Sequence, residues 1–177
     1  MTPGSAMVLE RFPVHVIVER RPATSRWLDH VWRPVAALPG RADAPEWHVL
    51  TEANGTTRYL AGNTDLAVHP AETAALKDNL EAAAPSVYVV LRPDAGPTGW
   101  RLLLATVDPA EAHSHSDSGT DLVEALPMAE PIRVWLTRFV ARHHVEKPIY
   151  KRKRDRSEKG DARLTGLHDA MVPEEDP

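Results

Sequence analysis

A short polar segment, EAHSHSDSGTD at residues 111–121, carries the side chains best suited to metal chemistry. Imidazole and carboxylate groups are ligands for zinc and other transition metals. If the backbone is extended, the alternate spacing of the two histidines lets them project to the same side. The other interpretation is a polar loop, because Asp108-Pro109 can start a turn and Ser118-Gly119 can end one. The candidate ligands are His113, His115, Asp117 and Asp121.

Motifs for nucleotide or hydrolytic catalysis are missing from the sequence. The 9 glycines are isolated, so no glycine-rich loop is available to bring backbone N–H groups to a phosphate. A Gly-x-Ser-x-Gly nucleophile elbow is also missing. Without cysteine there can be no thiolate nucleophile, thiolate zinc site or disulfide. We therefore predict a protein that is not an enzyme and has no cofactor.

Tryptophan and arginine side chains favour a surface that binds a partner. The chain has 5 tryptophans beside 2 phenylalanines and 3 tyrosines, and tryptophan combines a large contact area with one N–H donor. Trp100 and Trp135 fall within apolar patterns and are expected in the core. Trp27 and Trp32 have arginines on either side and are better candidates for the surface.

The end of the last predicted helix supplies two more candidates, His143 and His144. A capping role is the main alternative to ligand binding there, because the negative end of the helix dipole favours a protonated imidazole. We expect His143 to pack against the body of the protein and His144 to point outward. The candidate partner-binding residues are Arg26, Trp27, Trp32, Arg33, His143, His144, Tyr150, Lys151, Arg152, Lys153 and Arg154.

Charge is segregated along the 177 residues. The formal net charge of −4 divides into −5 over residues 1–146, +5 over residues 147–160 and −4 over residues 161–177. Residues 147–160 form a basic strip that could bind nucleic acid. Because the rest of the protein is acidic, docking of this strip to an acidic surface of another protein is at least as plausible. No apolar run reaches the roughly 20 residues that a bilayer span needs. We therefore expect a cytoplasmic protein that does not bind membranes, and we rank nucleic acid last among its partners.

The elements that must position these groups indicate an α+β fold. Alternating valines in residues 12–20 predict a strand, and Asn54-Gly55 predicts a tight hairpin. We expect a mostly antiparallel sheet, or a partly open barrel or roll, in which the strands at residues 86–91 and 100–107 are central. The remaining predicted elements are strands at 31–38, 46–50, 56–60 and 66–69, a short helix at 71–83 and a long helix at 130–144.

The same patterns divide the chain into three parts. Residues 1–11 form a flexible leader, residues 12–146 form a single α+β domain, and residues 147–177 form a flexible tail that is first basic and then acidic. The tail lacks regularly spaced large apolar residues, so burial cannot offset the entropy of ordering it.

The C-terminal third of the sequence resembles a known protein family. The most specific pieces are Pro127-Met128, Phe139-Val140, HHVE at residues 143–146 and YKRKR at residues 150–154. They resemble a proteobacterial family of unknown function that is encoded beside molybdenum-dependent formate dehydrogenase genes. Some members are labelled "molybdopterin-guanine dinucleotide biosynthesis protein A". The resemblance covers about residues 12–156.

The resemblance implies an association with a molybdoenzyme. Guanylyltransferases that carry the label quoted above have a glycine-rich nucleotide-binding loop after the first strand. In this sequence residues 20–27 contain no glycine. We therefore expect a non-enzymatic accessory protein or small subunit of a formate dehydrogenase, which acts in its assembly, maturation or complex formation. The alternatives are a carrier of a metal, molybdate or pterin cofactor and a nucleic-acid-binding regulator that uses the basic strip.

Overall fold

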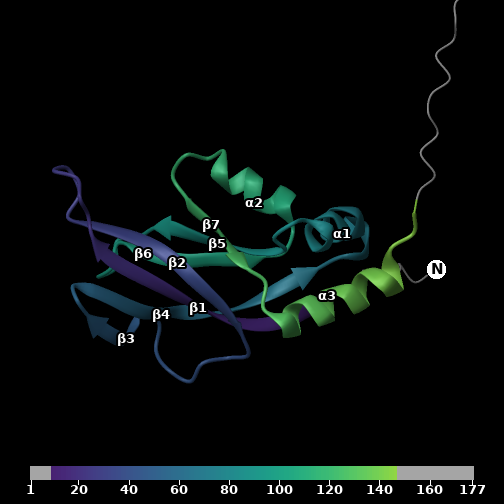
Figure 1. Cartoon of the computed structure of the whole chain (residues 1–177), viewed down its shortest axis with the longest axis horizontal. Coiled ribbons are helices and arrows are strands. Elements are labelled where there is room, and N and C mark those ends of the chain that lie inside the picture. The colour runs from purple at the N-terminus through teal and green to yellow at the C-terminus, as the bar shows by residue number, and fades with distance from the viewer. Residues whose placement is uncertain (1–8, 147–177) are drawn as a thin grey trace, which may run out of the picture. The chain divides into compact units, whose positions relative to one another are not determined.

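The computed structural model describes residues 9–146. Strands dominate the first half of this range, and helices are added between and after the later strands (Figure 1). The elements are β1 (Glu10–Pro22), β2 (His30–Pro39), β3 (His48–Ala53), β4 (Thr56–Val68), the 3-10 helix η1 (Pro70–Glu72), α1 (Thr73–Glu81), β5 (Ser86–Pro93), β6 (Trp100–Thr106), α2 (Pro109–Ser116), β7 (Leu122–Pro127) and α3 (Glu130–His143).

The strands form two antiparallel sheets. The first has the order β2-β1-β4-β3 and the second has the order β6-β5-β7. Within residues 9–146 the sheets do not close into a barrel. The predicted α+β class with antiparallel pairing is therefore confirmed. Of the two strands that we expected to be central, β5 lies in the middle of its sheet and β6 lies at an edge.

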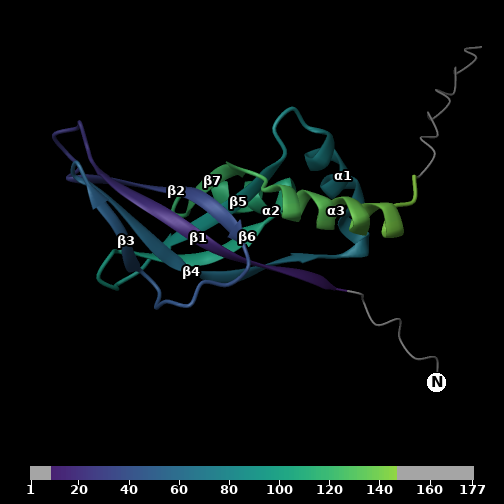
Figure 2. The same ribbon diagram turned by 60° about the horizontal axis from the view of Figure 1, so that its bottom comes forward.

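A single core joins the two sheets and two of the helices. Val14, Val16 and Val18 of β1 are fully buried, as the alternating pattern predicted. They pack in one cluster with apolar side chains of β4, β5, α1 and α3. In the two views of Figures 1 and 2 the second sheet lies across the first, and α3 runs alongside the start of β1. The sheets therefore stabilise each other through burial of apolar surface.

Both ladders of β1 are interrupted near its middle. The register with β4 shifts between Val16 and Ile17, and the register with β2 shifts between Ile17 and Val18. Such irregularities bend a strand and increase its local twist. The two halves of β1 therefore do not continue one regular ladder.

The predicted hairpin at Asn54-Gly55 is confirmed. Asn54 has φ of 53° and Gly55 has φ of 78°, the left-handed conformations that a two-residue hairpin turn needs. Ala53 pairs with Thr56 across the turn. The strands predicted at 56–60 and 66–69 are parts of one strand, because β4 continues through Gly62.

The long C-terminal helix is also confirmed, as α3. Ile132, Leu136, Phe139 and Val140 are buried along one side of it. Each large apolar side chain buried in this way contributes about 1.5–3 kcal/mol, so α3 is an integral part of the core. The helix begins after Ala129 with a proline in its first turn, where a missing N–H costs no hydrogen bond.

Two elements were not predicted. Helix α2 occupies part of the segment that we interpreted either as a metal site or as a polar loop, and β7 follows it. The predicted tail at residues 147–177 and the first eight residues of the predicted leader lie outside the described residues. Over residues 9–146, none of the helices has the length and apolar character needed to cross a membrane.

Candidate functional site

The loop between β1 and β2 presents the most exposed tryptophan of the described range. Trp27 has 90% of its surface exposed, and Leu28 and Val31 beside it are 60% and 46% exposed. Arg26 is exposed and has no ion-pair partner among residues 9–146. We call Arg26, Trp27, Leu28 and Val31 the tip patch. Tryptophan and arginine are the residues that most often dominate binding energy in protein interfaces.

Two hydrogen bonds restrain the conformation of the loop between β1 and β2. The backbone N–H of Ala23 donates to the carbonyl oxygen of Asp29 at 3.1 Å, which closes the loop at its base. The hydroxyl oxygen of Ser25 accepts from the N–H of Trp27 at 3.2 Å. Because side-chain oxygens of serine commonly fix turns in this way, the backbone that carries Trp27 is held in place even though its indole contacts no other ring within residues 9–146.

Trp32 differs from Trp27, because it is partly buried and packs against other aromatic rings. Its ring stacks on Tyr59 with 5.5 Å between centroids and meets Trp47 edge-on at 6.1 Å. We call Trp32, Trp47 and Tyr59 the aromatic base. The guanidinium carbon of Arg20 lies 5.8 Å from the rings of both Trp32 and Tyr59, a distance at which cation–π attraction contributes. Pairing of Arg20 with Trp32 across the strands places both on the same face.

The aromatic base includes a strained residue. Trp47 has φ of 60°, and its N–H donates to the carbonyl oxygen of Leu60 at 2.6 Å. A bulky side chain in this left-handed region costs about 1–3 kcal/mol, which the surrounding packing must offset. The base therefore fixes the end of the β1–β2 hairpin from which the tip patch projects. Trp100 and Trp135 are partly buried against the core, as predicted.

Arg33, another of the arginines predicted to bind a partner, joins the two sheets. Its Nη2 lies 3.0 Å from Glu124 Oε1 of β7, and its Nε donates to the same oxygen at 3.2 Å. The arginine side chain is 54% exposed, so the pair contributes at most about 1 kcal/mol. The structure thus gives Arg33 a carboxylate partner, whereas no carboxylate in the described part of the chain pairs with Arg26.

The two histidines at the end of α3 both contact the protein. The ring of His143 lies 4.6 Å from that of Phe139, as the expected packing requires. His144 was expected to point outward, but its Nδ1 lies 3.1 Å from the hydroxyl oxygen of Thr73 in α1. This bond links α3 to α1, and both histidines are half-buried. The remaining predicted residues, Tyr150, Lys151, Arg152, Lys153 and Arg154, lie outside the described range.

The four candidate metal ligands are divided into two separate pairs. The condition for a shared histidine face, an extended backbone, is not met, because residues 109–116 form α2, and positions two apart project from different sides of a helix. His113 Nε2 lies 3.7 Å from Asp117 Oδ2 at an exposed site, whereas His115 Nδ1 lies 3.2 Å from Asp121 Oδ2. Within the described residues, no three histidine, aspartate or glutamate side chains are grouped so that they could hold a metal ion.

Asp121 is already held by an arginine. Both of its carboxylate oxygens accept hydrogen bonds of 2.8 Å from Arg92, and its side chain has no exposed surface. The bonds from Arg92, with a further one from His115, lower the pKa of Asp121 to about 2. This arrangement links β5 and α2 to the residue that precedes β7, and it gives the carboxylate a structural role.

A signal in the sequence could have revealed α2. Asp108 accepts a hydrogen bond from the N–H of Ala110 at 2.9 Å and caps the helix, and Pro109 and Glu111 follow in the first turn. Aspartate, proline and glutamate in this order are typical of a helix N-terminus. We interpreted Asp108-Pro109 as a turn because no stripe of large apolar residues follows it.

Fold and surface together define an α+β protein in which the β1–β2 hairpin exposes an aromatic side chain and an arginine that has no ion-pair partner within residues 9–146. The chain belongs to the family described as "Protein of unknown function (DUF3305)", whose profile matches residues 13–154. The match includes both strands of the hairpin, α3 and the basic residues 151–154. No curated protein and no solved structure has significant similarity to the chain.

Proposed function

We propose that this protein is a non-catalytic accessory protein that docks to a protein partner through the tip patch. The exposure of Trp27 on an ordered loop is the observation that carries this proposal. A tryptophan that is 90% exposed leaves a large apolar ring in water. Burial of such a ring in a pocket of a partner, with the neighbouring arginine paired to a carboxylate, is the arrangement of an interface hot spot.

The hairpin suits this role because its base is rigid. Stacking in the aromatic base and the closing bond from Ala23 to Asp29 restrict the loop before any partner binds. A preorganised loop loses less conformational entropy on binding than a mobile one, so more of the contact energy appears as affinity.

The first partner to test is a molybdenum-dependent formate dehydrogenase or a factor in its maturation. The resemblance of residues 12–156 to a family encoded beside such genes supports this choice. The basic strip would add long-range attraction to an acidic partner surface. In this role the protein would act in assembly, maturation or complex formation of the enzyme.

Affinity purification from native cells, followed by mass spectrometry, tests the proposal. Wild-type protein should recover a molybdoenzyme subunit or a maturation factor, and Trp27→Ala should lower that recovery by about 30-fold, the effect of a hot-spot tryptophan. Leu50→Ala is the matched control, because Leu50 is an exposed apolar residue, 46% exposed, on β3.

Two results would count against the proposal. One is recovery of the same partners with Trp27→Ala and with wild type, which would remove the tip patch as the docking site. The other is recovery of wild-type protein free of any molybdoenzyme or maturation factor, which would exclude the proposed partners. Native mass spectrometry of the purified protein separates a docking protein from a carrier, because a carrier of metal, molybdate or pterin should show bound mass.

A further inference from the structure

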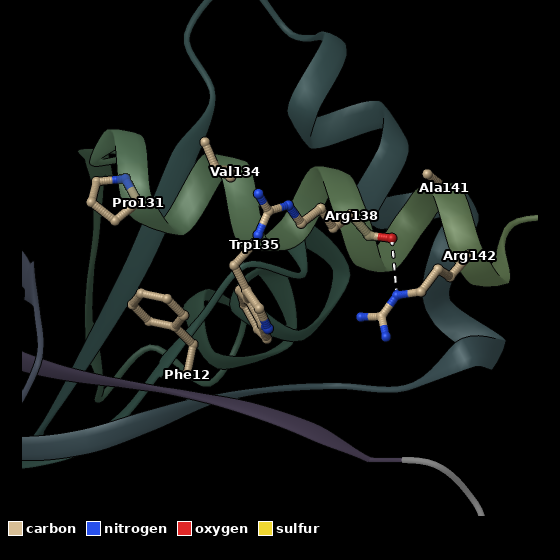
Figure 3. A pocket seen from close by; sticks show the side chains of 7 residues that line it. All are labelled: Phe12, Pro131, Val134, Trp135, Arg138, Ala141 and Arg142. Atoms are coloured by element: carbon tan, nitrogen blue, oxygen red, sulfur yellow. Dashed lines mark hydrogen bonds between the residues drawn. The ribbon is translucent and has the colours of Figure 1, made fainter.

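A second surface lies at the opposite end of β1 from the tip patch. Side chains of α3 and the start of β1 border a groove of about 760 Å³ (Figure 3). The α3 groove is lined by Phe12, Pro131, Val134, Trp135, Arg138, Ala141 and Arg142. From Phe12 to the end of β1 the strand has ten further residues, which at roughly 3.3 Å each separate the two surfaces by about 30 Å.

The walls of the groove are apolar and firmly held. The rings of Phe12 and Trp135 contact each other with 5.2 Å between centroids, and in Figure 3 the indole points from α3 toward β1 beside the phenyl ring. Val134, one residue before Trp135, is 39% exposed on the outer side of the helix. Because the two rings already pack against the core, an apolar side chain that enters the groove would meet a preformed surface.

The arginines of α3 differ in whether a carboxylate of this chain neutralises them. Arg142 pairs with Glu10 of β1 at 2.7 Å, and Arg133 lies 3.7 Å from Glu130. Arg138 is exposed at the rim of the groove and has no carboxylate partner among residues 9–146. The unbalanced positive charge at the groove is therefore that of Arg138.

We infer that the α3 groove binds an acidic amphipathic segment of a protein partner. One large apolar side chain of the segment would fill the groove between Val134 and Trp135, and a carboxylate beside it would pair with Arg138. The inference follows from charge complementarity: a groove with apolar walls and one guanidinium that no carboxylate of the described residues neutralises matches a segment that combines an apolar anchor with a carboxylate. It goes beyond the proposed function, because it concerns another surface and another kind of contact.

Peptide selection on the full-length protein tests this inference. A phage-displayed library of random 12-residue peptides would be selected for binding to the wild type. Peptides that also bind the double variant Val134→Glu with Arg138→Glu would be removed by counter-selection. We expect the enriched peptides to combine a large apolar residue with at least one carboxylate. Binding of the fluorescein-labelled peptides, measured by anisotropy, should weaken at least tenfold in Arg138→Glu and should also weaken as salt is raised.

The matched control is Arg133→Glu, which reverses a charge on the same helix at a residue that does not line the groove. It should leave affinity within about twofold of wild type. Circular dichroism and urea unfolding of each variant would establish that exposed substitutions leave the fold intact.

Several outcomes would overturn the inference. These are no enrichment over the double variant, enriched peptides without carboxylates, and equal weakening by Arg133→Glu and Arg138→Glu. Sedimentation that shows a dimer disrupted by Val134→Glu would assign the groove to a second copy of the chain instead. Loss of peptide binding in Trp27→Ala would move the site to the tip patch. Failure of the tip-patch proposal would leave the peptide-binding result unchanged, because the peptide experiment measures binding that depends on Arg138.

Discussion

Trp27 and Trp32 belong to one hairpin and are five residues apart, yet they have opposite environments. Trp27 is almost wholly exposed, whereas Trp32 stacks on Tyr59 and contacts Trp47 edge-on. Arginine follows or precedes each of them, so local composition does not distinguish the two. The difference arises from strand pairing, which places Trp32 opposite Arg20 and leaves Trp27 in the loop beyond the ladder. The hairpin thus has a structural base and an exposed tip.

The largest effect should come from the base. Trp32→Ala removes a stacked ring and leaves Trp47 in its strained conformation without one of its contacts, so we expect the free energy of unfolding to fall by about 3 kcal/mol. Urea unfolding followed by circular dichroism would measure it. A loss of less than about 0.5 kcal/mol would mean that the base does not stabilise the hairpin.

A similar contrast exists on a smaller scale between two aspartates. Asp121 is fully buried on Arg92, and Asp117 is 70% exposed beside His113. Because the pKa of Asp121 falls from 3.8 to about 2 on folding, its charged form stabilises the native state. This stability is fully present above about pH 4 and is lost as pH falls toward 2.

Urea midpoints measured between pH 5 and pH 2 would test the aspartate contrast. Asp121→Asn should be less stable than wild type at pH 5, and the difference should shrink as the pH approaches 2. Asp117→Asn should follow the wild-type curve. An Asp121→Asn curve parallel to that of wild type would show that ionisation of Asp121 does not contribute.

A substitution in the Asn54-Gly55 turn, which joins β3 to β4, should lower stability by a moderate amount. Gly55 has φ of 78°, and a Cβ atom there would lie 3.3 Å from Cγ of Pro22, the last residue of β1. We expect Gly55→Ala to lower the free energy of unfolding by about 1–2 kcal/mol. Gly99→Ala is the matched control, since Gly99 has φ of 77° and an added Cβ there meets nothing within 4 Å. Equal losses in thermal or urea unfolding would assign the whole effect to backbone strain.

The smallest effect on stability should come from the tip. Trp27→Ala should change the free energy of unfolding by no more than about 0.5 kcal/mol, because the side chain is 90% exposed. Trp27→Phe should also remove the part of the tryptophan fluorescence that acrylamide quenches most readily. If Trp27→Ala destabilised the protein as much as Trp32→Ala, the distinction between tip and base would fail.

Local patterns were sufficient for much of the fold. The alternating valines of β1, the Asn54-Gly55 turn and the apolar stripe of α3 each specify their element through neighbours in the sequence. The position of Trp32 depends on which residue of β1 it faces, and register cannot be deduced from one strand alone. The α3 groove was not predicted either, because Phe12 and Trp135 are far apart in the sequence and meet only in the folded protein.

Helix α2 was missed for another reason. Its only buried residue is Ala112, so the helix has no stripe of large apolar side chains to produce a period of 3.6. Its stability comes from the Asp108 cap and from contacts with the second sheet, and these depend on the folded neighbours. The four candidate metal residues are close in sequence, but the structure divides them into two pairs, which the spacing alone does not show.

The double interruption of β1 near Val16, Ile17 and Val18 has a consequence for stoichiometry. It changes the direction of the strand between the tip patch and the α3 groove. The two surfaces lie at opposite ends of this strand, at most about 30 Å apart along it. Under the two proposals above, one molecule of this protein binds two polypeptides at the same time, one at each end of β1.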